Sequence, residues 1–96
     1  MARKIEEQVL SFGEVPQPHQ VITIVYSSVR IESSRLYKDL VPTDAVKHAI
    51  LFLQREAEEQ GADGIKNISI EMVPVHTENG EEVVDFYAMG TLFKFV

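Results

Sequence analysis

Hydrophobic and polar positions along the chain predict three strands and one helix. Residues 21–31 are rich in β-branched and aromatic side chains and contain neither Gly nor Pro, which is typical of a strand. Residues 65–75 place Ile68, Ile70 and Met72 at every second position, with polar residues between them. This two-residue period predicts a second strand that buries one of its faces.

A helix is predicted between these two strands. It begins after Pro42, where Thr43 is expected to cap it and Asp44 is expected to interact favourably with the helix dipole. Gly61 ends it, because the left-handed conformation that closes a helix is least costly for glycine. The residues predicted to face the sheet recur at helical spacing: Val46, Ala49, Ile50, Leu53 and Ala57.

The third strand covers residues 83–95 and follows a hairpin turn predicted at Asn79-Gly80. A right-handed crossover through the helix makes the first two strands parallel, and the hairpin makes the third antiparallel to the second. Apolar residues on both faces favour a central position for the last strand. The side chains that we expect to face the helix are Val84, Phe86, Ala88 and Leu92.

The predicted fold is therefore α+β. It is a single β-α-β-β domain over residues 1–96, with a three-stranded antiparallel sheet packed on one long helix. Residues 21–96 form the core. Residues 1–20, interrupted by Pro16 and Pro18, are interpreted as an arm that packs on the domain or on a neighbouring subunit. In the connection before the helix, the side chains expected to turn inward are Leu36, Tyr37 and Leu40.

A second apolar stripe lies on the face of the last strand that points away from the helix. It consists of Tyr87, Met89, Phe93 and Phe95. Because one helix covers only one face of a small sheet, this stripe predicts an interface between subunits. The alternative is that the N-terminal arm folds over these residues.

Composition excludes several classes of function. The net charge of −6 argues against binding to nucleic acid, whose phosphates are recognised mainly by Lys and Arg. The chain has no cysteine, which excludes disulfides, thiolate metal sites and a cysteine nucleophile. No signal-peptide pattern and no apolar run of membrane-spanning length is present, so we expect a cytoplasmic protein without a membrane partner.

Two linked motifs carry a resemblance to a known family. The segments AEEQGADGIKNISIEM and FYAMGTLFKF resemble the YbjQ-like family of small bacterial and archaeal proteins, which carries a heavy-metal-binding label. The resemblance covers residues 45–96. The sequence departs from the family at Gln60 and Gly64, and it lacks the family's Gly-Gly-Arg-Ser stretch. The matching positions are Ala57, Gly61, Ala62, Asp63, Gly64, Ile65, Gly90 and Thr91.

The resemblance implies a dodecin-like β-α-β-β subunit that assembles into a homo-oligomer, typically a pentameric ring. The matched residues that form the helix-to-strand turn are Gly61, Ala62, Asp63 and Gly64. These residues allow a tight reversal of the chain and carry no catalytic group. The resemblance therefore implies a fold, and it identifies no catalytic residue.

Few side chains in the sequence point to binding chemistry. His48 and His76 are the candidate metal ligands, but no two histidines have the spacing of a local metal motif. Tyr26 and Tyr87 are the candidate cofactor-binding residues, because a planar ligand such as a flavin could stack on them. The identity of any cofactor is not predicted.

The sequence is interpreted as a small oligomer-forming protein that binds a metal ion or small molecule at its subunit interfaces. One alternative is a dodecin-like assembly that binds flavin or another small molecule. A second is a small enzyme whose inter-subunit site combines His48 or His76 with a carboxylate. That enzyme would need a pocket that brings these groups together and shifts their pKa values.

Overall fold

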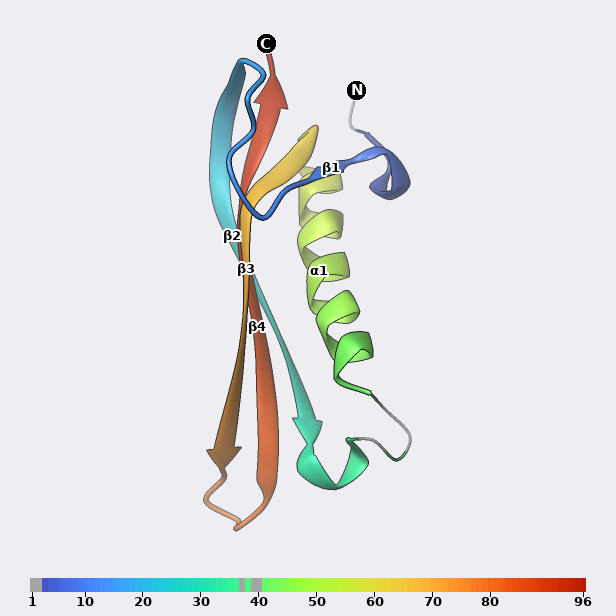
Figure 1. Cartoon of the computed structure of the whole chain (residues 1–96), viewed down its shortest axis with the longest axis vertical. Coiled ribbons are helices and arrows are strands. Elements are labelled where there is room, and N and C mark those ends of the chain that lie inside the picture. The colour runs from blue at the N-terminus through green and yellow to red at the C-terminus, as the bar shows by residue number, and fades with distance from the viewer. Residues whose placement is uncertain (1–2, 37, 39–40) are drawn as a thin grey trace.

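The computed structural model describes residues 3–36, 38 and 41–96 as one helix lying along one face of a twisted sheet (Figure 1). The α+β class is as predicted, but the sheet has four strands. The elements, in chain order, are η1 (Ile5–Glu7), β1 (Val9–Leu10), β2 (His19–Glu32), η2 (Ser33–Arg35), α1 (Pro42–Glu59), β3 (Gly64–His76) and β4 (Glu82–Phe95). None of the helices among the described residues has the length and apolar composition needed to cross a membrane.

The strand order is β1-β3-β4-β2, and β4 pairs antiparallel with both β2 and β3. The last strand is therefore central, as predicted. The prediction of three strands is wrong because the arm contributes β1, which pairs parallel with Gly64 and Ile65 of β3. Gly64 has no side chain, and a Cβ atom there would collide with the Val9 carbonyl oxygen. A two-residue strand is too short to be recognised from hydrophobic periodicity.

The start of α1 differs from the prediction. Val41 occupies the capping position and makes no side-chain cap, while Pro42 is the first helical residue. Thr43 is therefore the second residue of the helix and cannot act as its N-cap. Asp44 does lie in the first turn, where the helix dipole favours its charge.

The end of α1 agrees with the prediction. Gly61 has a φ of 71°, and its N–H donates to the Glu58 carbonyl oxygen at 3.2 Å. The Ala62 N–H donates to the Ala57 carbonyl oxygen at 2.9 Å. These two bonds form a Schellman motif, which satisfies carbonyl groups that the helix itself leaves unpaired.

The core lies between α1 and the sheet. Ala49, Leu53 and Ala57 of the predicted stripe are buried, as is Ala45, while Val46 and Ile50 are half-buried at its margin. Three alanines in this buried row let the helix approach the strands closely. The side chains of β4 predicted to face the helix belong to the same core, together with Val25, Ile31, Ile65 and Ile68 from the other strands.

The sheet is longer than the helix, and the molecule measures 49 × 21 × 21 Å. The hairpin between β3 and β4 extends beyond the first turn of α1 (Figure 1). Its turn is where Asn79-Gly80 predicted it, with Gly80 at a φ of 80°. In the connection before α1, Leu36 packs against the core, whereas Tyr37 and Leu40 lie outside the described residues.

Candidate functional site

The sheet face that points away from α1 carries an exposed apolar patch. Cross-strand pairing places Tyr26 opposite Met89, and Ser28 opposite Tyr87. The exposed fractions are 72% for Tyr26, 51% for Ile24, and 43% for both Tyr87 and Met89. We call this surface the open face and define it by Ile24, Tyr26, Arg30, Asp85, Tyr87 and Met89.

A polar cluster of Arg30, Asp85 and Tyr87 lies at one end of the open face. Arg30 Nε donates to Asp85 Oδ1 at 2.7 Å and Arg30 Nη2 donates to Asp85 Oδ2 at 2.8 Å. The Tyr87 hydroxyl donates to the same Oδ2 at 3.1 Å. Asp85 is only 4% exposed, so its charge is compensated almost entirely by these two neighbours.

These hydrogen bonds fix the protonation states of the cluster. The Arg30 guanidinium lowers the pKa of Asp85 below its usual range and outweighs the effect of burial, which acts in the opposite direction. The Asp85 carboxylate raises the pKa of both Arg30 and Tyr87, because it stabilises their protonated forms. Asp85 therefore stays ionised and Tyr87 stays protonated near neutral pH, which is unsuitable for general acid–base catalysis.

The predicted interface stripe is divided by the N-terminal arm. Phe93 is fully buried within the chain and makes edge-to-face contacts with His19 and Phe95, both with ring centroids 5.2 Å apart. Phe95 is half-buried, with the Arg3 guanidinium 5.4 Å from its ring centroid. The arm thus covers this end of β4, as the alternative expected, and leaves Tyr87 and Met89 exposed. Phe93 is consequently part of the chain's own packing.

Asp63 anchors the arm as well as forming part of the predicted turn. Its Oδ1 accepts from Arg3 Nε at 3.1 Å, and its Oδ2 accepts from the Phe95 N–H at 2.7 Å. Farther along the arm, Lys66 Nζ donates to Glu14 Oε1 at 2.7 Å. These contacts join distant parts of the sequence and were not predicted, because no local pattern marks such partners.

The structure does not bring the candidate metal ligands together. His48 is on the exposed side of α1, and His76 is at the end of β3, where its Nε2 is 3.5 Å from Glu82 Oε1. Both side chains of the His76–Glu82 pair are well exposed. Within residues 3–36, 38 and 41–96, no group of three or more His, Cys, Asp or Glu side chains could hold a metal ion.

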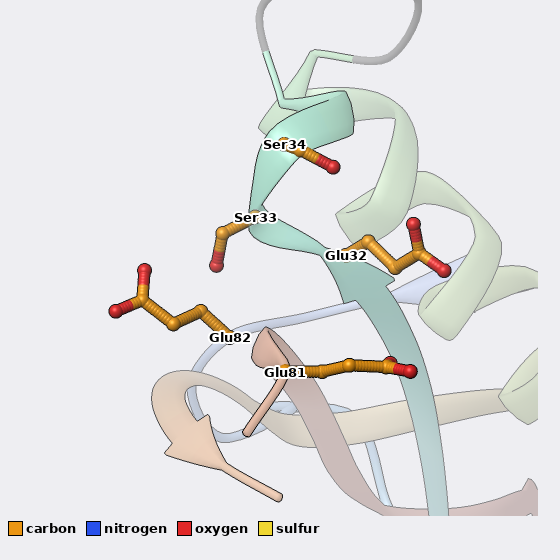
Figure 2. A pocket seen from close by; sticks show the side chains of 5 residues that line it. All are labelled: Glu32, Ser33, Ser34, Glu81 and Glu82. Atoms are coloured by element: carbon orange, nitrogen blue, oxygen red, sulfur yellow. The ribbon is translucent and has the colours of Figure 1, made fainter. Parts of the chain in front are cut away.

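A polar depression lies between η2 and the β3–β4 hairpin (Figure 2). Figure 2 shows that the carboxylate of Glu82 points away from those of Glu32 and Glu81, so the three acids do not converge on one point. Without convergence, a group of surface carboxylates is a solvated acidic surface. The lining residues are Glu32, Ser33, Ser34, Glu81 and Glu82.

The sequence contains a signal for the polar cluster. Asp85 interrupts an apolar run in a strand predicted to be central, and a buried carboxylate requires a partner. Arg30 is the only basic residue in residues 21–31. The antiparallel pairing of β2 with β4 places these two residues directly opposite each other.

The fold has a counterpart among solved structures. A crystal structure of a protein of unknown function from Pediococcus pentosaceus, which belongs to the DUF74 family, matches with a TM-score of 0.79 and 13% sequence identity. The match covers 93% of this chain and 98% of the other. At this identity the likeness shows the fold alone. No family model matches the chain, and no curated protein matches it. Membership of the YbjQ-like family stays a prediction from the sequence.

Proposed function

We propose that the chain is a non-enzymatic subunit that associates with copies of itself through the open face. The observation that carries this proposal is the exposure of Ile24, Tyr26, Tyr87 and Met89 on one side of the sheet. Contiguous apolar surface of this kind is typical of an interaction site. Tyr and Met are also enriched at interfaces, and aromatic side chains bury a large area there.

A homo-oligomer is the assembly proposed, with five subunits as the number that the family resemblance implies. The polar cluster supports the use of this face as a contact. Arg30 and Asp85 hold each other in fixed positions beside the apolar residues, so a partner would meet a preorganised surface. Preorganised side chains lose less conformational entropy on binding.

A small molecule at the boundary between subunits is the proposed ligand. Tyr26 and Tyr87 are diagonal neighbours on the open face, because Tyr26 is opposite Met89 and Tyr87 is two residues before Met89. Diagonal positions on neighbouring strands are about 7–8 Å apart, which is within reach of aromatic side chains. This arrangement favours the binding of a planar aromatic ligand, as in the dodecin-like alternative, over the binding of a metal ion.

The alternative of a small enzyme has no comparable support. His48 and His76 lie on different elements, and the contact of His76 Nε2 with Glu82 Oε1, at 3.5 Å, is between two exposed side chains. An inter-subunit site would need a second subunit to supply the missing groups. We therefore propose binding rather than catalysis.

Native mass spectrometry of the protein as purified tests this function. We expect a closed oligomer, and any mass in excess of the polypeptide would identify the bound molecule. The double variant Tyr87→Glu/Met89→Glu should be smaller than the wild type, because it would bury charge in an apolar contact. Met72→Glu is the matched control, since Met72 is also exposed (58%) but points to the other side of the sheet. An unchanged mass for the double variant would exclude the open face as the contact.

A further inference from the structure

We infer that two copies of this chain also associate edge to edge, joining their β2 strands into one continuous sheet around a two-fold axis that passes beside Phe52. This contact uses a surface distinct from the open face proposed above and does not depend on that proposal. The partner is a second copy of the same chain. Three features carry the inference: the unprotected edge of β2, the row of helix side chains beside it, and the complementarity of that row with itself.

The two edges of the sheet are built differently. β2 is the last strand in the order and has 14 residues, and its segment 21–29 contains neither a charged residue nor proline. At the opposite edge, β1 covers the start of β3, and the remainder of β3 contains Glu71 and Pro74. Charges, proline and a covering segment are the usual devices that prevent edge strands from pairing. Residues 21–29 of the β2 edge have none of them, so this part of the edge is available for pairing.

A row of helix side chains flanks this edge. Phe52 is 46% exposed and lines a shallow depression together with residues 23–26 of β2 and with Glu56. His48 borders the same phenylalanine on the other side. Because His48, Phe52 and Glu56 are four residues apart, they lie in a line along one face of α1. A strand added to β2 would therefore lie against an aromatic side chain with a basic group at one end and an acidic group at the other.

The row is centred on the middle of the strand. The midpoint of β2 falls between Val25 and Tyr26, with seven residues of the strand on either side. The depression that contains Phe52 is lined by residues of this same middle segment. A two-fold axis perpendicular to the sheet beside Val25, next to the midpoint, would pair the two β2 strands antiparallel over residues 19–31, with Val25 opposite Val25 of the second copy so that paired side chains share a face. It would also bring Phe52 towards Phe52 of the second copy.

The same rotation makes the charges complementary. It reverses the direction of the helix row, so His48 of each copy faces Glu56 of the other, and the pair occurs twice. Self-complementarity of this kind is what a two-fold interface requires, and an unrelated peptide would supply the strand without the matching charges.

Charge reversal tests the arrangement by sedimentation equilibrium of the full chain. His48→Glu places two acidic groups opposite each other, and Glu56→Arg places a basic group opposite His48. We expect each change to raise the dissociation constant of the β2 contact by about tenfold or more. The double variant His48→Glu/Glu56→Arg restores opposite charges and should return the dissociation constant to the wild-type value. Failure of this rescue, with circular dichroism showing a folded protein, would overturn the inference.

A covalent test locates the axis. The chain has no cysteine, so a single introduced thiol gives an unambiguous cross-link. Phe52→Cys should form a disulfide-linked dimer rapidly on mild oxidation, because its two copies meet at the axis. Met72→Cys, at an exposed site on the opposite edge, should react only slowly. Equal rates for the two variants would contradict the proposed axis.

The two proposed contacts can be separated in one further experiment. In the Tyr87→Glu/Met89→Glu variant, which removes the open-face contact, the edge contact should persist and yield a dimer. Adding Phe52→Glu to that variant should then yield a monomer. If the first variant is already monomeric at about 100 µM, a concentration well above typical dissociation constants of specific interfaces, the edge contact does not exist.

Discussion

Arg30 on β2 and Asp85 on β4 face each other directly across the sheet and are joined by two hydrogen bonds, of 2.7 and 2.8 Å. Asp85 is nearly fully buried, whereas Arg30 reaches to the surface. The pair lies beside the exposed apolar side chains of Tyr26, Tyr87 and Met89. It makes the stability of the fold depend on pH.

We expect Arg30→Gln to lower the melting temperature most at neutral pH and least in acid. Arg30 lowers the pKa of Asp85 below its ordinary value of 3.8. A carboxyl group whose pKa is lower in the folded state contributes stability above its unfolded pKa and loses that contribution as pH falls through the folded pKa. Removing Arg30 removes this contribution. Thermal unfolding from pH 2 to pH 7 measures it, and Asp85→Asn in the Arg30→Gln background should restore much of the loss. If the melting temperature of Arg30→Gln differed from that of the wild type by the same amount at every pH, Arg30 would not have this role.

Glu14 should titrate far below a normal glutamate. The hydrogen bond from Lys66, followed by one from the Val15 N–H, lowers its pKa from 4.5 to about 2. The stability that this contact contributes is present above pH 4.5 and is lost as pH falls towards 2, although solvent screens a pair in which Glu14 is well exposed. Carbon-detected NMR titration of the Glu14 carboxyl group measures the pKa. Lys66→Met should raise it towards 4.5, and an unchanged value would show that Lys66 is not the cause.

Gly61→Val should destabilise the fold by about 1 kcal/mol or more, because a β-branched residue is strained in the left-handed conformation. The φ of 71° at Gly61 places it in that region. Gly13→Ala is the control, since Gly13 does not have such a φ and a Cβ there would meet nothing within 4 Å. Urea unfolding of both variants gives the two free energies. Equal stability of Gly61→Val and the wild type would refute the helix cap.

Gly64→Ala should release β1 from the sheet at a cost of about 1–3 kcal/mol, the usual range for inserting an atom into a filled site. The new Cβ would meet the Val9 carbonyl oxygen and would lie 2.8 Å from Phe93 Cζ. Hydrogen exchange offers a local measurement. The Val9 and Ser11 amides, which donate to the Asp63 and Ile65 carbonyl oxygens at 3.1 and 2.9 Å, should lose protection. Amides shared by β2 and β4 should keep theirs. Retained protection at Val9 and Ser11 would show that the strand tolerates the side chain.

Much of the fold was predictable because its signals are local. The periodicity of Ile68, Ile70 and Met72, the glycine at Gly61 and the turn at Asn79-Gly80 each depend on a few neighbouring residues. The central position of the last strand also followed, since β4 is apolar on both faces. The errors concern short or context-dependent features. β1 has two residues, and the cap expected at Thr43 was displaced when Pro42 took the first helical position.

The candidate site was predictable only in part. Tyr87 and Met89 are exposed as the interface stripe required, but Phe93, from the same alternating set, is buried beneath the arm. Alternation along a strand indicates which face a side chain occupies. It does not indicate what covers that face, because coverage depends on segments distant in the sequence.

The sequence by itself determined the order of the long elements, the side of the last strand that turns towards the helix, and the glycine that ends the helix. These features depend on backbone geometry and side-chain period, which act over one or two turns of chain. Only the tertiary structure decided that Arg30 pairs with Asp85, that Asp63 holds Arg3, and that β2 is left with an open edge. These depend on which distant segments meet, and that outcome is set by the packing of the whole chain rather than by any local pattern.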